Sequence, residues 1–433
     1  MDVHSSRRVR LRLLSLCTVV AALLAPALLQ AQDYRYPLQD RWLATVVGTP
    51  SQFQPPMPDK NPLRPRRIRI FEDREVPEVI WYNQDMRYSA ALQSGAAPVM
   101  FLIAGTGAAH DGSKNVFMAK LFHERGFHVI SLSSPTFPNF VAAASKTAVP
   151  GHVHRDAEDL YRAMEMTWND IKGSRTATGF YLTGYSLGAF NAAFVANLDN
   201  QRKVFDFERV MMINPPVSLY NSISLLDRMI ENIPGGEDNF DQFFERLVRV
   251  FSDVYKRSQD NVGFGEDFLT LVFQAMQPKN EELAALIGVS FRLSSGSMMF
   301  TTDVMTDYGF IKPKGLVIDK HADLANYRRI SQRVGFTDFY HEFFFPYYRE
   351  EYPGMDRDGF INEMGLSSIR EYLKNADNVF VMHNEDDIIL APGEINFFRD
   401  VFGSRAKIYP WGGHLGNMMF VENAAHMVGV ITQ

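Results

Sequence analysis

Cysteine is almost absent from this chain. Of the 433 residues, one is a cysteine, Cys17, and it lies in an apolar stretch near the N-terminus. A single cysteine excludes an internal disulfide, and apolar surroundings do not lower the pKa of a thiol as a catalytic thiolate requires. The chain also has no Asn-x-Ser/Thr acceptor for N-glycosylation. We therefore look for chemistry that does not depend on thiolates, disulfides or cysteine-bound metals.

A large excess of charge of either sign is missing as well. The formal net charge is −6, with 44 basic and 50 acidic residues. A balance of this kind gives no reason to expect nucleic acid as a partner. Hydrophobic residues make up 46% of the chain, which is enough for one large core with an inserted subdomain.

Residues 1–31 have the pattern of a secretory signal peptide. Four arginines precede an apolar stretch over 13–29, and Ala31 stands before a polar residue. We expect cleavage after Ala31 and a periplasmic or secreted protein. The alternative is an uncleaved membrane anchor, because the apolar run approaches the roughly 18 residues that can cross a bilayer.

Residues 32–66 form the next segment and are rich in proline and polar residues. The stretch 52–58 contains three prolines, so we expect no regular element there. The composition predicts an extended N-terminal arm that lies on the surface of the domain.

From 67 to 216, and again from 377 to 433, apolar strand patterns alternate with helical ones. Continuous apolar runs such as 99–103 are typical of buried parallel strands. The alternation predicts an α/β fold with a doubly wound, mostly parallel sheet covered by helices on both faces. The expected strands are 67–71, 79–82, 99–103, 127–132, 180–183, 210–213, 379–382 and 406–409.

The alternation of strand patterns and helix patterns is interrupted between 217 and 376. Apolar residues recur at helical spacing over 240–255, and 268–276 and 281–287 are also helical in pattern. This predicts a mainly helical cap inserted into the core. Its aromatic and methionine side chains either pack against the sheet or line an acyl pocket. The apolar face over 240–255 suggests a further hypothesis, peripheral contact with a membrane.

The sequence GYSLG at 184–188 follows an apolar strand pattern and precedes a helical one. A serine at such a turn is held in strained backbone angles, and glycines two positions to either side leave room for the turn. The hydroxyl of Ser186 is therefore expected to stand above the sheet edge, at the start of a helix. This pattern indicates a nucleophilic serine.

A serine nucleophile needs a base, and the base needs an acid to orient it. His414 lies in the glycine-rich loop WGGHLG at 411–416, after the last expected strand. His152 and His154 are second choices as the base, whereas His128, His383 and His426 are expected to be packed imidazoles. For the acid, Asp387 has the best position beyond strand 379–382, with Asp386 as the alternative.

With Ser186, Asp387 and His414 in this order, the chain resembles the α/β-hydrolase superfamily. The resemblance covers the chain from about Arg67 to the C-terminus and implies an α/β-hydrolase fold with a cap insertion. It also implies that the backbone N–H groups of Leu187 and Thr106 form an oxyanion hole. Two residues depart from the common pattern, Ala104 where many members have histidine and Asn384 where many have glycine.

These features predict an exported serine hydrolase that cleaves a carboxylic ester or related acyl bond through an acyl-enzyme. The expected substrate is a small or lipid-like acyl compound, and no metal or organic cofactor is required. A peptidase, amidase or thioesterase with the same three residues is an alternative, as is a non-catalytic envelope binding protein on the same fold. The sequence does not indicate an oligomeric state.

Overall fold

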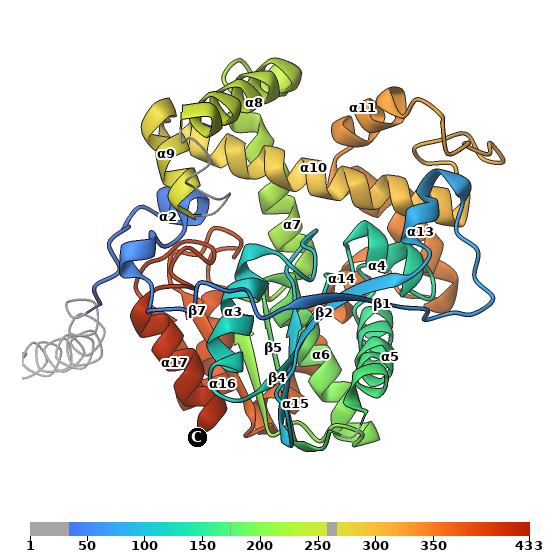
Figure 1. Cartoon of the computed structure of the whole chain (residues 1–433). Coiled ribbons are helices and arrows are strands. Elements are labelled where there is room, and N and C mark those ends of the chain that lie inside the picture. Colours follow the sequence, from blue (N-terminus) through green and yellow to red (C-terminus); the bar gives the residue numbers. More distant parts are fainter. Residues whose placement is uncertain (1–33, 174, 258–265) are drawn as a thin grey trace, which may run out of the picture.

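A computed structural model describes residues 34–173, 175–257 and 266–433 (Figure 1). The expected signal peptide and its alternative, a membrane anchor, lie outside the described residues. Eight strands form one sheet in the order β1-β2-β4-β3-β5-β6-β7-β8. They are β1 (Arg64–Ile68), β2 (Met86–Ala91), β3 (Ala97–Ile103), β4 (His128–Leu132), β5 (Ala177–Tyr185), β6 (Arg209–Ile213), β7 (Val379–Asn384) and β8 (Ala406–Tyr409).

The sheet is mostly parallel. Strand β2 runs antiparallel to both of its neighbours, β1 and β4, whereas every pairing from β4 through β8 is parallel. Because carboxyl ends of parallel strands meet at one edge, the loops that follow β3, β5, β7 and β8 converge there. This edge carries all of the expected site residues.

Helices cover both faces of the sheet, as the alternating pattern predicted. Along β3, Val99 and Phe101 belong to one apolar cluster and Met100 and Leu102 to the other, as expected for side chains that alternate between faces. The first cluster includes helices α5 (Val153–Lys172), α6 (Leu187–Arg202) and α16 (Ile395–Phe402). The second includes α3 (Ser113–His123) and α17 (Val421–Thr432).

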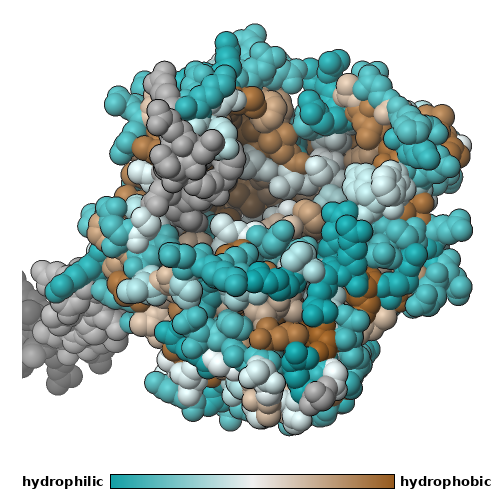
Figure 2. Space-filling model, in the orientation of Figure 1, coloured by the Kyte–Doolittle hydropathy of each residue, from teal (hydrophilic) through white to brown (hydrophobic). Residues whose placement is uncertain are grey.

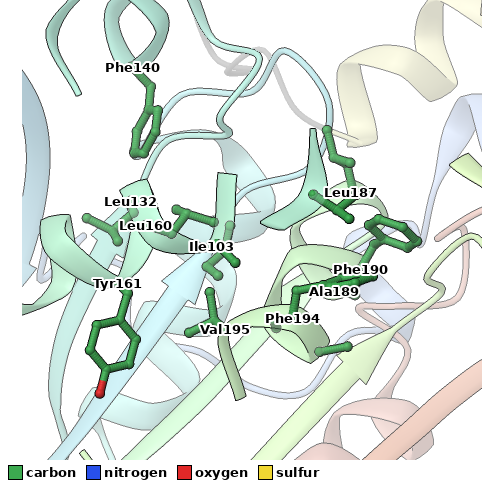
Figure 3. Packing of buried hydrophobic residues seen from close by; sticks show 14 of the residues in the cluster. Ile103, Leu132, Phe140, Leu160, Tyr161, Leu187, Ala189, Phe190, Phe194 and Val195 are labelled. Carbon is green, nitrogen blue, oxygen red and sulfur yellow. The ribbon is translucent and has the colours of Figure 1, made fainter. Parts of the chain in front are cut away.

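Helix α6 is the central packing element beside the site. Its side chains Phe190, Phe194 and Val195 lie among those of β3 and α5, including Ile103 and Leu160 (Figure 3). Phe190 is fully buried, so this end of the helix cannot shift without opening a cavity in the core. The packing fixes the position of the residue that precedes α6, Ser186.

The segment 217–376, which we call the cap, lies between β6 and β7 and is mainly helical. Its longest helix is α10 (Asn280–Thr306), which crosses above the carboxyl edge of the sheet (Figure 1). The other helices are α7 (Leu219–Arg228), α8 (Phe240–Arg257), α9 (Glu266–Met276), α11 (Ala325–Arg333), α12 (Phe336–Phe339), α13 (Phe345–Tyr348), α14 (Arg357–Glu363) and α15 (Arg370–Asn375).

Helix α10 is long and apolar enough to cross a membrane, with a mean hydropathy of 1.4 over its most apolar window. Within the structure, however, 61% of that window is buried. It also packs against helices of the cap and against α2 (Arg41–Val47) and α4 (Pro138–Ala143). These contacts are those of a core helix.

Two strand predictions at the start of the core need correction. The predicted strand 67–71 is β1, which begins and ends three residues earlier, at Arg64–Ile68. The predicted strand 79–82 is a 3₁₀ helix, Glu78–Asn83. Val79 and Ile80 are both buried there and the next two residues are both exposed, which a strand with alternating faces does not allow. The adjacent strand β2 was not predicted.

The predicted extended arm is also only partly correct. It contains helix α2 (Arg41–Val47), which begins after Asp40, whose carboxylate accepts hydrogen bonds from two N–H groups of the first turn. A short 3₁₀ helix, Ser51–Phe53, follows where no regular element was expected. Tyr34 and Tyr36 are buried, so the arm is part of the core rather than a surface strap.

The apolar face of α8 packs inside the cap. Phe240, Phe243 and Leu247 are buried in a cluster with Ala285 and Val289 of α10. This part of the face is covered, whereas Val248 and Tyr255 of the same helix are exposed, so membrane contact through α8 stays a prediction.

Candidate active site

Ser186 stands at the turn between β5 and α6. Its backbone angles are φ 54° and ψ −125°, a strained conformation for a residue with a side chain. A Cβ atom at Gly184 would lie 2.4 Å from the carbonyl oxygen of Gly188, and one at Gly188 would lie 2.2 Å from that of Ile103. Both flanking glycines are therefore required for β3, β5 and α6 to meet at this turn.

The structure brings Ser186, His414 and Asp387 into one hydrogen-bonded chain. The Nε2 atom of His414 lies 2.9 Å from the Ser186 hydroxyl oxygen. Its Nδ1 atom lies 3.1 Å from both carboxylate oxygens of Asp387. A proton on Nδ1 is donated to the carboxylate, which leaves Nε2 as the acceptor for the serine proton.

Asp387 is buried and well supplied with hydrogen-bond donors. Its carboxylate accepts from the side-chain amide of Asn214 at 2.8 Å and from the Ile389 N–H at 3.1 Å. Burial by itself raises the pKa of this carboxyl. The favourable interaction with His414, together with the hydrogen bond from Asn214, outweighs burial and holds the pKa below its ordinary value. The group is therefore an anion at neutral pH.

Asp386, the alternative acid, has a different set of partners. Its carboxylate accepts hydrogen bonds from the N–H groups of Gly412 and Gly413, at 3.3 and 3.0 Å. Burial raises the pKa of Asp386 to about 6, against the lowering effect of these two N–H groups. Asp386 thus holds the loop that carries His414, while Asp387 contacts the imidazole.

The remaining candidate histidines are not bonded to Ser186. His152 is hydrogen-bonded to the Tyr352 hydroxyl at 2.7 Å, and burial lowers its pKa to about 4. His154 lies 3.1 Å from Glu363. His383 accepts the Asn384 N–H on Nδ1 and donates from Nε2 to the Pro215 carbonyl, so it is a neutral structural imidazole. Burial likewise lowers the pKa values of His128 and His426.

Leu187 and Thr106, the expected oxyanion donors, lie on the two sides of Ser186. Leu187 is the first residue of α6, so its N–H has no partner within the helix. Thr106 belongs to the loop after β3 and lines the same cavity as Ser186. Among the described residues, no protein acceptor takes a hydrogen bond from either N–H. Both donors remain available for a ligand.

The N-terminal arm braces the His414 loop, a role that sequence reasoning missed. The Thr45 hydroxyl accepts the His414 N–H at 2.8 Å. Gly413 has φ 56°, and a Cβ there would lie 2.2 Å from the carbonyl oxygen of Arg41. Trp411 donates from its indole N–H to the Tyr36 carbonyl at 2.9 Å. The only local sequence signal for a helix at this place is Asp40, a residue type that is favourable before the first turn of a helix such as α2.

A pair of buried asparagines joins β7 to the same loop. Asn384 donates to the Gly413 carbonyl at 2.7 Å, and Asn417 donates to the Asn384 side chain at 2.6 Å. Asn417 also donates to the Tyr34 hydroxyl at 2.8 Å. Asn384 therefore has a structural reason to replace the glycine that is common before the acid: its side chain ties the acid strand to the base loop.

Ser186 and His414 open into an apolar cavity of about 530 Å³ between the sheet edge and the cap. Figure 2 shows the hollow and its hydrophobic lining. The cap contributes most of the wall, from α8, α9 and α10, and Lys114 and Thr45 contribute polar atoms at the sheet side. The apolar lining residues from the cap are Leu226, Phe251, Leu269, Val272, Phe273, Met276, Pro278, Leu283, Leu286, Ile287 and Phe291.

Across residues 34–173, 175–257 and 266–433, no group of three or more histidine, cysteine or acidic side chains is arranged to hold a metal ion. The carboxylates near the site are already used by His414, by backbone N–H groups or by asparagine side chains.

No protein-family model and no curated protein sequence matches this chain. Among solved structures, the chain is similar to a bacterial membrane phospholipase A, with 16% identity over 98% of each chain and a TM-score of 0.39. It is similar to the thioesterase domain of the curacin biosynthetic pathway, with 13% identity, 86% and 100% coverage and a TM-score of 0.39. A proline iminopeptidase from Mycobacterium smegmatis matches at 12% identity, 81% and 95% coverage and a TM-score of 0.40.

The order of the site residues along the sheet defines the type of fold. A mostly parallel eight-stranded sheet carries the serine turn after β5, the acid after β7 and the histidine loop after β8. This arrangement of strands and site residues is that of an α/β-hydrolase fold.

Proposed function

We propose that this protein is an exported serine hydrolase that cleaves a carboxylic ester or a related acyl bond. The observation that carries the proposal is the hydrogen-bonded chain from the Ser186 hydroxyl through His414 to Asp387, with distances of 2.9 and 3.1 Å. Export is proposed from the signal-like sequence of residues 1–31.

The reaction takes place in two halves. The Ser186 oxygen bonds to the acyl carbon while its proton moves to Nε2 of His414, and the carbonyl oxygen becomes an oxyanion. The N–H groups of Leu187 and Thr106 stabilise that oxyanion, each by roughly 3–4 kcal/mol. The leaving group then departs with the proton from Nε2, and Ser186 is left acylated.

In the second half, water hydrolyses the acyl-enzyme. His414 takes a proton from the water, whose oxygen bonds to the acyl carbon and forms a second oxyanion. Collapse of this intermediate breaks the bond to the Ser186 oxygen, which recovers its proton from Nε2 and releases the acid. Asp387 remains an anion throughout and stabilises the imidazolium formed in both halves.

The cavity wall favours acyl substrates over peptides. Its lining is apolar on the cap side, so it offers few partners for the backbone amides of a peptide. An alkyl or aryl acyl chain loses water on entry at no such cost. An amide, peptide or thioester substrate would use the same three residues, and matched substrates that differ only in the leaving group distinguish these activities.

The test is replacement of the serine, with a second serine in the same cavity as control. Ser186→Ala should lower turnover of a short p-nitrophenyl ester by several orders of magnitude, because it removes the nucleophile. Ser290→Ala, which changes another cavity-lining hydroxyl, should retain turnover within a few-fold.

Fluorophosphonate labelling separates an enzyme from a binding protein on the same fold. We expect the label on Ser186 and no label in the Ser186→Ala protein. Unchanged turnover in Ser186→Ala, or a wild-type protein that neither turns over esters nor reacts with the label, would end the proposal.

A further inference from the structure

A second concave site lies next to the catalytic cavity and is basic rather than apolar. It has a volume of about 390 Å³. Three arginines line it, Arg66 and Arg67 from β1 and Arg87 from β2, together with His110 and Asp111 from the loop after β3. Arg67 and Arg87 are paired across β1 and β2, and Asp111 is the one carboxylate in this lining, so the site carries net positive charge.

Two of these arginines are paired across β1 and β2. Arg67 lies directly opposite Arg87 in the antiparallel pairing of β1 and β2, where like charges are unfavourable. Within the part of the chain that the structure describes, neither forms an ion pair, whereas Arg69 on the same side of the molecule is paired with Asp85 at 3.1 Å. Arg87 donates instead to the neutral carbonyl of Tyr82 at 2.8 Å. An anion placed between the two guanidinium groups would relieve their repulsion.

The loop after β3, which forms one wall of the basic pocket, is held in place by hydrogen bonds. His110 is buried, with Nδ1 hydrogen-bonded to the Ser89 hydroxyl at 2.8 Å. Its backbone N–H donates to the Ser133 hydroxyl at 3.0 Å. Asn115 and Ser131 are hydrogen-bonded below it at 2.6 Å. The pocket is therefore formed before any ligand arrives, which lowers the entropy cost of binding.

One stretch of backbone separates this pocket from the catalytic cavity. Residues 109–111 of the loop line the basic pocket, while Thr106 and Ala108 of the same loop line the cavity beside Ser186. In Figure 1, β1 crosses the front of the molecule below α10, and Figure 2 shows a hydrophilic band below the hollow on that face. The basic pocket and the catalytic cavity are therefore neighbours on the two sides of this loop.

Two exposed aromatic side chains lie just before β2, the strand that carries Arg87. Trp81 is 62% exposed and Tyr82 is 50% exposed, and their rings meet edge to face with centroids 6.1 Å apart. They belong to the 3₁₀ helix that precedes β2, and the Tyr82 carbonyl is the acceptor for Arg87. Exposed Trp and Tyr rings are typical of surfaces that lie at the interface between water and lipid.

We propose that the basic pocket binds the phosphate of an anionic glycerophospholipid and so docks the mouth of the cavity against a membrane surface. Guanidinium forks match phosphate oxygens in charge and geometry, and the flanking aromatic pair inserts at the headgroup level. This proposal rests on the proposed function in one respect only: after docking, an acyl chain of the lipid enters the catalytic cavity. The docking itself does not require catalysis.

The experiment compares vesicle binding of full-length variants that all carry Ser186→Ala, so that no lipid is cleaved. Vesicles are made of phosphatidylcholine alone or with phosphatidylglycerol, and bound protein is measured by sedimentation. Because every variant has the same residues 1–33, any contribution of that segment is common to all of them. The test variant adds R67Q and R87Q. The control adds R202Q and K374Q, two exposed basic residues on α6 and α15, at the end of the molecule away from α10 (Figure 1).

We expect R67Q/R87Q to weaken partitioning onto phosphatidylglycerol vesicles by about tenfold or more and to leave binding to phosphatidylcholine alone unchanged. R202Q/K374Q should bind as the parent does, and thermal unfolding midpoints should show that all variants are folded. Equal partitioning of the test variant and the parent, or an equal loss in the control, would overturn the proposal.

A second measurement distinguishes a membrane lipid from a soluble phosphate ester. Glycerol 3-phosphate is titrated into the same proteins by calorimetry. Binding of this probe that depends on Arg67 and Arg87, without any effect of these arginines on vesicles, would assign the pocket to a soluble ligand and refute membrane docking. Ester turnover by the protein with Ser186 intact is measured separately, so failure of the hydrolase proposal leaves the vesicle result independent.

Discussion

The two sides of the catalytic cavity are built in different ways. On the sheet side, backbone atoms define the site: Gly184, Gly188 and Gly413 each stand where a Cβ would lie within 2.4 Å of a carbonyl oxygen. On the cap side, the wall consists of apolar side chains such as Leu269 and Val272, whose volumes define the space. A change on the sheet side should therefore alter the rate on every substrate. A change on the cap side should alter which substrates fit.

The largest effect should come from the acid on the sheet side. Asp387→Asn removes the charge that stabilises the His414 imidazolium and favours the wrong tautomer, so turnover of a short ester should fall on the order of 1,000- to 10,000-fold. Asp386→Asn is the matched control, since it keeps an oxygen acceptor for the Gly412 and Gly413 N–H groups and should cost less than about tenfold. A larger loss in Asp386→Asn than in Asp387→Asn would reverse the roles of the two acids.

The next effect should come from backbone crowding at the serine turn. A Cβ at Gly188 would lie 2.2 Å from the Ile103 carbonyl oxygen and 2.6 Å from that of Ala104, just before Thr106. Gly188→Ala should reduce the free energy of unfolding by roughly 3 kcal/mol and lower turnover with it. Gly95→Ala, where no atom lies within 4 Å, should change stability by no more than about 0.5 kcal/mol in the same denaturant titration.

A smaller effect should come from the arm that braces the histidine loop. Thr45→Val removes the acceptor of the His414 N–H and leaves a partly buried donor without a partner, a cost of about 1–3 kcal/mol. We expect turnover of every ester to fall about tenfold, because the loop that carries the base loses an anchor. Thr45→Ser keeps the hydroxyl and should restore activity. If Thr45→Val had wild-type kinetics, the arm would be irrelevant to catalysis.

The smallest effect should be confined to the cap and to long substrates. Leu269 faces the cavity, whereas Leu271 on the same helix is 36% exposed. Leu269→Trp should lower kcat/KM for long-chain esters about tenfold and leave short esters unchanged, since the added ring occupies space that the chain would use. Leu271→Trp should change neither. A uniform loss on all chain lengths in Leu269→Trp would mean that the cap wall positions the reacting groups.

The sheet side could be predicted from sequence because its signals are local. The turn at Ser186 is marked by its own two glycines, and apolar runs such as 99–103 mark buried strands. The order of Ser186, Asp387 and His414 along the chain then follows the order of strands. Helices of the cap were also predicted from their periodicity, although α10 extends far beyond the predicted 281–287, to Thr306.

The contacts between distant segments could not be predicted in this way. The hydrogen bond from His414 to Thr45 joins residues 369 positions apart, and no local pattern marks Thr45 as a partner. Proline-rich composition suggested an extended arm, whereas burial of Tyr34 and Tyr36 shows that tertiary packing determines its conformation. Residues 79–82 were assigned to a strand on β propensity alone, and their paired burial overrode that preference.

The bracing of His414 by Thr45 also has a consequence for how the protein is made. A ribosome that has passed Asp387, just beyond β7, has already produced the nucleophile, the oxyanion loop and the acid, but not the base. The imidazole arrives with the last strand, and it is held in place only when that late segment folds back onto α2, which was synthesised near the start. Chains cut short after β7 would therefore carry an inert serine, so premature products could not attack acyl bonds inside the cell.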